Sequence, residues 1–269
     1  MSSQVDLYNS TYGNFENDIM AEIRCETYGQ DIGQNSWITV EEYDQFYSWL
    51  NFSSDMNKKQ VLEVASGSGG PTLYLAEKYK CQITGIDINE QGLNRAQQTA
   101  HDLKLSNASF KFTDMNKQVP FNDNSFDGIL CMDSMNHFVD RLHVLREWYR
   151  ILKPKGRVVF TDPVVITGSV SNRELALRSS IGFFIFVPLS DTKDFINKAG
   201  FKLHLCQDVT GNIELTSSRW YKARQSRCDQ LIKIEGEERF NGLQNFAKTV
   251  HHLTSERRLS RFVFLAEKE

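Results

Sequence analysis

Apolar residues follow two different periods along this chain, and the alternation of these periods predicts a fold that mixes strands and helices. Between about residues 60 and 163, short continuous apolar runs alternate with segments in which apolar residues recur every three or four positions. The runs are typical of buried strands and the segments of amphipathic helices. Because the connections are short, we expect parallel strands covered by helices on both faces of the sheet. The strands predicted in this part are 61–64, 82–88, 108–115, 126–133 and 157–162.

Two further strands are predicted in the last part of the chain, at 201–206 and 259–266. A long helical insertion at about 212–256 separates them. We interpret the charges of this insertion as a solvated face and its Trp220 as a packing residue.

Residues 1–55 precede the first strand and are expected to form a helical arm, whereas 56–269 form the main domain. Residues 40–50 have helical apolar spacing, and Thr39 followed three residues later by a glutamate is the pattern of a capping box. The polar, aromatic and glycine-containing stretch 28–37 is open to two interpretations. It either covers the sheet edge or forms a lid that excludes water from bound ligands.

Composition excludes several classes of protein. The chain of 269 residues can bury a substantial core, and its formal net charge of -3 gives no electrostatic reason to expect a nucleic-acid partner. Its five cysteines include no CxxC pair, so we predict no disulfide framework and no metal site. The longest apolar run, 181–189, is about half of what a membrane-spanning helix requires. With no export signal at the N-terminus, we expect a cytoplasmic protein without a membrane span.

A glycine-containing turn joins the first predicted strand to the helix that follows it. Gly67 and Gly69 lack a Cβ atom, so the main chain can adopt positive φ angles and approach a ligand closely. Glu63 places a carboxylate beside the turn. Such a turn can also be a simple connector, which is common in α/β proteins.

Acidic residues recur where four successive predicted strands end. Asp87 follows Gly67 by about 20 residues, the separation at which a βαβ unit presents a carboxylate to ribose hydroxyls. One such acid can be a helix cap, but four at successive strand ends favour a shared ligand edge. Thr72 occupies the third glycine position of a dinucleotide fingerprint, which disfavours a dehydrogenase. The four acids are Glu63, Asp87, Asp114 and Asp133.

The glycine turn followed by Asp87 and Asp114 resembles the class I S-adenosylmethionine (SAM) methyltransferases. The resemblance implies a Rossmann-like, mostly parallel seven-stranded sheet with helices on both faces and an antiparallel last strand. It also implies that the turn passes the methionine part of SAM, Asp87 holds the ribose and Asp114 meets the adenine amino group. Ala65 stands where the family usually has its first glycine. The residues expected to contact this cofactor are Glu63, Ala65, Ser66, Gly67, Gly69, Asp87, Ile88, Asp114, Met115 and Met132.

The segment from Asp133 to His137 is the candidate for acceptor chemistry. It is similar to phosphoethanolamine and sarcosine/dimethylglycine N-methyltransferases, in which an aspartate at this strand end precedes a histidine by four residues. The resemblance implies that Asp133 lies beside cofactor and acceptor and that His137 takes a proton from an ammonium or hydroxyl group. The alternative is that His137 caps or packs the following helix. The tyrosine that partners this histidine in the family corresponds roughly to Ile32, and Tyr28 is the nearest substitute.

The basic and tyrosyl residues with which the phosphoethanolamine enzymes bind phosphate are replaced here by the apolar stretch 182–186. A phosphate needs donors and positive charge, so we predict an acceptor with a sizeable apolar part instead. The alternative is that this stretch is ordinary core. The residues expected to contact the acceptor are Tyr28, Trp37, Asn136, Phe183 and Phe184.

These observations predict a SAM-dependent methyltransferase of class EC 2.1.1 that acts on a small molecule, with nitrogen as the first candidate for the methylated atom. Three alternatives stay open. The first is methylation at carbon or oxygen of a quinone-like or phenol-like acceptor, because ubiquinone and tocopherol C-methyltransferases share much of this pattern. The others are a NAD-dependent oxidoreductase and a SAM-binding protein without catalysis. The oligomeric state is unknown from the sequence.

Overall fold

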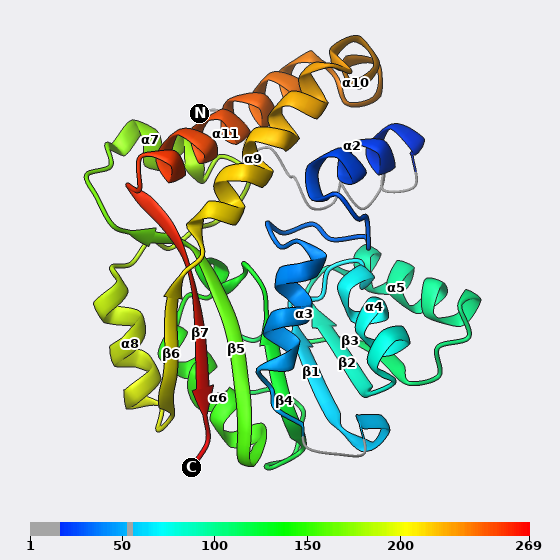
Figure 1. Ribbon diagram of the computed structural model, residues 1–269, viewed down its shortest axis with the longest axis vertical. Coiled ribbons are helices and arrows are strands. Elements are labelled where there is room, and N and C mark those ends of the chain that lie inside the picture. Colours follow the sequence, from blue (N-terminus) through cyan, green and yellow to red (C-terminus); the bar gives the residue numbers. More distant parts are fainter. Residues whose placement is uncertain (1–16, 53–55) are drawn as a thin grey trace.

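The computed structural model describes residues 17–52 and 56–269, which form a central sheet, helices on both of its faces and a further helical layer (Figure 1). Of the predicted N-terminal arm at 1–55, residues 1–16 and 53–55 lie outside the described part. Among the described residues, no helix combines the length and the apolarity that crossing a bilayer requires.

The sheet has seven strands within the described residues, in the order β3-β2-β1-β4-β5-β7-β6. The strands from β3 to β5 are parallel to their neighbours, and β7 is antiparallel to both β5 and β6. The predicted Rossmann-like sheet with an antiparallel last strand is therefore confirmed. The strands are β1 (Gln60–Val64), β2 (Gln82–Asp87), β3 (Ala108–Phe112), β4 (Phe126–Cys131), β5 (Leu152–Ile166), β6 (Lys202–Asp208) and β7 (Leu259–Glu267).

Helices cover the two faces of the sheet because successive strand residues point to opposite sides. In β1, Val61 packs with residues of α3 and α4, whereas Leu62 and Val64 pack in the cluster that contains Trp148 of α6. Helix α8 joins the α6 side, and α5 packs with α4. The helices of the two faces are α3 (Val40–Ser48), α4 (Gly70–Tyr79), α5 (Glu90–Asp102), α6 (Arg141–Ile151) and α8 (Leu189–Lys198).

A second group of helices lies above the carboxyl ends of the strands, at the top of Figure 1. Ile23 of α2 packs against Ala223, Leu231 and Phe240, so the N-terminal arm and the segment between β6 and β7 share one apolar cluster. The helices of this layer are α2 (Asp18–Tyr28), α7 (Asn172–Arg178), α9 (Thr210–Gln225), α10 (Cys228–Glu235) and α11 (Glu237–Ser255). The described residues also include the short 3₁₀ turns η1 (Met56–Lys58) and η2 (Met135–His137).

Only one of the two hydrogen bonds of the predicted capping box forms at the start of α3. The Thr39 hydroxyl accepts a hydrogen bond from the Glu42 N–H at 3.5 Å, as expected of an N-cap. The Glu42 carboxylate, however, does not complete a capping box. It accepts instead from Arg261 of β7 and from Asn212 of α9, because a buried cation attracts it more strongly than the backbone of its own helix.

Candidate active site

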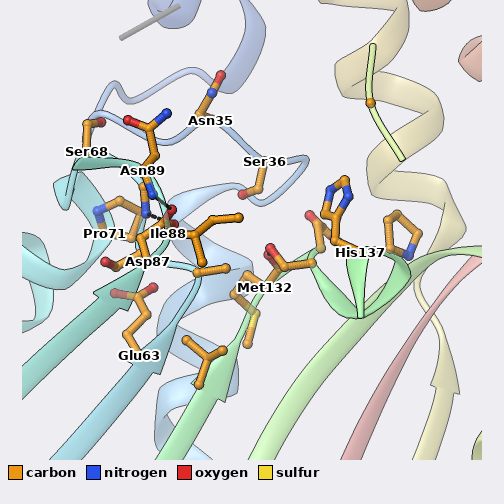
Figure 2. Close-up of a pocket in the computed structure, with 18 of the residues that line it drawn as sticks. Asn35, Ser36, Glu63, Ser68, Pro71, Asp87, Ile88, Asn89, Met132 and His137 are labelled. Atoms are coloured by element: carbon orange, nitrogen blue, oxygen red, sulfur yellow. Dashed lines mark hydrogen bonds between the residues drawn. The ribbon is translucent and has the colours of Figure 1, made fainter. Parts of the chain in front are cut away.

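A cavity of about 770 Å³ lies between the carboxyl ends of the strands and the overlying helices (Figure 2). The four strand-end acids that the sequence singled out all line it, so the fold brings them to one site. Figure 2 shows Asp87, Ile88 and Asn89 at one end of the pocket and His137 at the other, with Met132 between them. The strand-end acids and His137 therefore line one shared cavity.

Asp87 ties the glycine turn to the end of β2. Its Oδ2 atom accepts a hydrogen bond from the Gly67 N–H at 2.8 Å, and its Oδ1 atom accepts from the Asn89 N–H at 2.8 Å. Burial raises the pKa of Asp87, and the two N–H groups oppose that shift. A carboxylate oxygen has two lone pairs, so both oxygens can still accept from the hydroxyl groups of a ribose.

The glycine turn is shaped by positive φ angles. Gly67 has φ +55°, and Ala65, at the position where the family usually has glycine, has φ +58°. Such an angle is uncommon for a residue with a Cβ atom and is held by surrounding contacts. The Ser66 N–H donates to the Ile86 carbonyl at 3.0 Å, which anchors the turn on β2.

Glu63 is a buried carboxyl beside this turn. The Tyr43 hydroxyl donates to its Oε1 atom at 2.5 Å, and the Thr72 hydroxyl donates to its Oε2 atom. Burial raises the pKa of Glu63 to about 7, against the effect of these two hydrogen bonds. Near neutral pH a cationic ligand group beside Glu63 would therefore shift the carboxyl to its ionised form.

Asp114 lies in the loop after β3 and lines the cavity. Its Oδ1 atom accepts from the backbone N–H of Asn116 at 3.0 Å and from the side-chain amide at 3.2 Å. Burial raises its pKa, but these bonds and the charge of Lys117 outweigh burial and lower the pKa. Met115 and Met132 are buried and add apolar surface to the wall.

Asp133 is held by protein groups on both carboxylate oxygens. Its Oδ1 atom accepts from the Thr161 hydroxyl at 2.8 Å and from Arg261 Nε at 2.6 Å. Its Oδ2 atom accepts from the Trp37 N–H at 2.9 Å. The side chain thus belongs to a structural network at the cavity wall, which is a different arrangement from that of an exposed proton acceptor.

His137 ends the η2 turn and faces the cavity. Its Nδ1 atom lies 2.8 Å from the Phe183 carbonyl oxygen, so Nδ1 carries the proton of the neutral ring and Nε2 is an acceptor. Burial lowers the pKa of His137, and the positive charge of Arg178 lowers it further. Tyr28, the nearest substitute for the family's tyrosine, donates its hydroxyl to the Ser36 carbonyl at 2.7 Å.

Aromatic rings line the end of the cavity near His137. The Trp37 ring lies 6.3 Å from each of the Trp220 and Phe246 rings, centroid to centroid. The Arg178 guanidinium lies over the Phe184 ring at 5.0 Å and over the Phe246 ring at 5.2 Å, within cation–π distance. This end is therefore aromatic, and the buried Arg178 side chain lies against its rings.

Two predicted contact residues are not among the residues that line the cavity. Gly69, at φ +78°, faces the interior, where a Cβ atom would lie 2.8 Å from the Phe110 ring. Asn136 is fully buried, and its carbonyl accepts from the Ile185 N–H at 2.8 Å. The other predicted contact residues line the cavity.

Several lining residues were not singled out from the sequence. Trp220 was interpreted as a packing residue, and it both packs on Trp37 and lines the cavity. Arg178 had a possible signal, because it stands just before the apolar stretch 182–186, whereas Phe246 had none. The lining residues missed in this way include Asn35, Ser36, Pro71, Asn89, Asn116, Phe138, Arg178 and Phe246.

Comparison with known proteins identifies the family. Residues 55–221 match the model of a family described as a methyltransferase domain, so the chain belongs to this family. The predicted resemblance to class I SAM-dependent small-molecule methyltransferases is confirmed, and SAM is the cofactor of the class.

Relatives within the class differ in the atom that they methylate. The chain is 28% identical over 193 residues to a glycine/sarcosine/dimethylglycine N-methyltransferase of Actinopolyspora halophila. This match covers 66% of this chain and 32% of the relative. It is 25% identical over 243 residues to a 27-O-demethylrifamycin SV methyltransferase of Amycolatopsis mediterranei. This second match covers 86% of this chain and 82% of the relative. The chain thus spans about a third of the first relative and most of the second.

A solved structure shows the same fold. Phosphoethanolamine N-methyltransferase 2 of Haemonchus contortus, in complex with phosphomonomethylethanolamine and S-adenosylhomocysteine (SAH), superposes with a TM-score of 0.80 at 18% identity. The match covers 98% of this chain and 60% of that protein.

Proposed function

We propose that this protein transfers the methyl group of SAM to a small molecule with a sizeable apolar part. One observation carries the proposal: a single cavity combines a rim of strand-end acids with an aromatic wall that contains His137. The acids suit a nucleoside with an amino-acid tail, and the aromatic wall suits the acceptor.

The cavity residues fit SAM by their donor and acceptor types. Asp87 would accept from the ribose hydroxyls, Asp114 would accept from the adenine amino group, and Glu63 would face the methionine ammonium group. Gly67 would let the main chain pass close to the methionine part. When bound, SAM supplies a methyl group already activated by the sulfonium charge.

The chain's own part in the reaction is to orient the acceptor and to accept its proton. His137 Nε2 is the acceptor atom in the neutral ring, and the lowered pKa keeps the ring neutral at pH 7. Orientation alone can supply several kcal/mol of the barrier, about 7–11 in well-oriented systems. The aromatic wall would hold the apolar part of the acceptor while it limits the access of water.

Nitrogen remains the first candidate atom from the sequence, in the form of a neutral amine. Oxygen or carbon of a quinone-like or phenol-like acceptor is the second candidate, and the relatives include a 27-O-demethylrifamycin SV methyltransferase.

Calorimetric titration with SAH and with NADH tests the cofactor class. We expect SAH to bind and NADH not to bind, and binding of NADH alone would overturn the proposal. Methyl transfer is then followed by mass spectrometry with SAM that carries a deuterated methyl group. Matched aromatic phenols, anilines and quinones separate oxygen, nitrogen and carbon acceptors. Tight SAH binding without transfer to any of them would favour a SAM-binding protein without catalysis.

A further inference from the structure

A buried guanidinium joins two carboxylates at the edge of the cavity. Arg261 of β7 has no exposed surface, and its Nε atom donates to Asp133 Oδ1 at 2.6 Å. Its Nη1 atom donates to both carboxylate oxygens of Glu42 at 2.7 Å. Burying these charges costs desolvation free energy that their attraction often does not repay. The best-attested reason for a protein to keep a buried ion pair is that it fixes the relative position of the segments that it joins. Arg261 and Glu42 are not among the residues that line the cavity.

One of these carboxylates binds the Trp37 backbone directly, and the other binds it through the Asn212 side chain. The Trp37 N–H donates to Asp133 Oδ2 at 2.9 Å. The Asn212 side-chain amide uses one hydrogen for the Trp37 carbonyl at 2.9 Å and the other for Glu42 Oε2 at 2.6 Å. The backbone of Trp37 is therefore tied to β4, α3 and α9 through groups that Arg261 brings together.

Trp37 belongs to the segment 29–39, which connects α2 to α3 and forms one wall of the cavity. Figure 2 shows Asn35 and Ser36 of this segment across the pocket from Glu63. The segment also lies directly against the start of α4, where an added Cβ on Gly70 would meet the Ile32 and Gly33 backbone. Its position therefore sets the width of the half of the cavity that contains Glu63 and the glycine turn.

Asp133 has a backbone conformation that suits this structural role. Its φ angle is +54°, which is uncommon for a residue with a Cβ atom. The Asp133 N–H donates to the Thr161 hydroxyl at 2.7 Å, and that hydroxyl donates back to Asp133 Oδ1 at 2.8 Å. These bonds aim the carboxylate at Arg261 and at the Trp37 N–H.

We propose that Arg261 is a positioning residue for cofactor binding, which acts through Asp133, Glu42 and Asn212 to hold the segment 29–39 over the cavity. The inference rests on the proposed function only in taking this cavity as the SAM site. Asp133 is then a positioning residue as well, and the proton of the acceptor goes to another group.

The test compares two variants that leave the cavity lining intact. Asn212→Ala removes both amide hydrogen bonds without a change of charge. Arg261→Lys keeps the charge but replaces a planar fork with a single ammonium group, which cannot reproduce both carboxylate contacts. We expect the Kd for SAH to rise about tenfold in each, the equivalent of about 1.4 kcal/mol. Amide hydrogen exchange in 29–39 should accelerate by a similar factor.

Two matched controls separate positioning from general destabilisation. Thr254→Ala removes a buried hydroxyl that donates to the Val250 carbonyl within α11. Arg157→Lys weakens the pair of Arg157 with Glu267 at the other end of the same β5–β7 pair. Each should lower the Tm without a change in the Kd for SAH or in exchange at 29–39.

Unchanged SAH affinity and unchanged exchange at 29–39 in folded Asn212→Ala protein would overturn the inference, as would an equal loss of SAH affinity in the controls. Should Arg261→Lys fail to fold, Asn212→Ala still decides the question. Hydrogen exchange needs no ligand. If the parent protein bound no SAH, the proposed function would fail, while exchange at 29–39 would still report on the positioning role.

Discussion

The Nδ1 atom of His137 lies 2.8 Å from the backbone carbonyl oxygen of Phe183, and this contact joins the η2 turn to the apolar stretch after α7. A ring held in this way has a defined tautomer, with Nε2 as the acceptor. The contact links His137, which would take the proton, to the aromatic wall that would bind the molecule to be methylated.

His137→Asn is expected to lower kcat by about 10²- to 10⁴-fold, the usual contribution of a general base. The asparagine amide can still donate to the Phe183 carbonyl, but no acceptor remains at the position of Nε2. The Kd for SAH should stay unchanged in calorimetry, which serves as the control for folding. A variant with full kcat would exclude His137 as the base.

Arg178→Gln is expected to move the acidic limb of the pH profile to higher pH. Burial and the Arg178 charge lower the pKa of His137, so activity should fall only when the pH drops below the ordinary imidazole value of about 6.5. Removal of the charge raises this pKa, and the same loss of activity should then begin at higher pH. The measurement is kcat/KM between pH 5 and 8, and an unshifted limb would contradict the assignment.

Affinity for SAH is expected to increase with pH up to about 7 because of Glu63. Burial raises the pKa of Glu63 to about 7 in the free protein, so an ammonium group must displace a proton at lower pH. Glu63→Gln should weaken SAH binding and flatten its pH dependence, as measured by calorimetry in buffers of different ionisation enthalpy. A pH dependence that persists in the variant would place the titrating group elsewhere.

The same carboxyl is expected to affect stability. Its folded-state pKa is raised above the ordinary glutamate value of 4.5, so between pH 4.5 and about 7 the folded protein keeps a proton that the unfolded chain has lost. The free energy of unfolding should therefore fall as the pH rises through this range, by up to about 1.4 kcal/mol per pH unit. Denaturant unfolding of the parent protein and Glu63→Gln checks this, because the variant should lose that contribution to the slope.

Phe184→Ala is expected to raise the KM for an apolar acceptor by about 10- to 100-fold, since a buried aromatic ring contributes about 1.5–3 kcal/mol. Phe184 lines the cavity and its ring centroid lies 4.9 Å from that of His137. Phe121→Ala is the matched control, because Phe121 packs on Phe126 away from the cavity lining. Equal effects of the two substitutions, or none in folded Phe184→Ala protein, would show that the wall has no role in acceptor binding.

Gly70→Ala is expected to weaken SAH binding by about tenfold or more. The added Cβ would lie 2.7 Å from Gly33 Cα and closer still to the Ile32 carbonyl, so the segment 29–39 must move. Overpacking of this kind costs about 1–3 kcal/mol. Gly211→Ala is the control, because nothing lies within 4 Å of the corresponding Cβ. Retained SAH affinity in Gly70→Ala protein would show that this close approach is irrelevant to the cofactor.

Periodicity along the chain was sufficient to predict the sheet, its helices and the acids at its rim. These features depend on local preferences: apolar runs form buried strands, and in a parallel sheet the strand ends meet at one edge. Asp87 could be located from the sequence because its distance from Gly67 follows from the length of a single βαβ unit.

The assignment of roles within the site depended on contacts between distant segments. The resemblance places Asp133 beside cofactor and acceptor, and the sequence gives no sign that Arg261, 128 residues away, binds its carboxylate. Asn136 and Gly69 belong to the expected motifs but lie behind the wall, whereas Phe246 enters the cavity from the far end of the chain. Burial and charge pairing arise only when these segments pack together, and no local pattern encodes them.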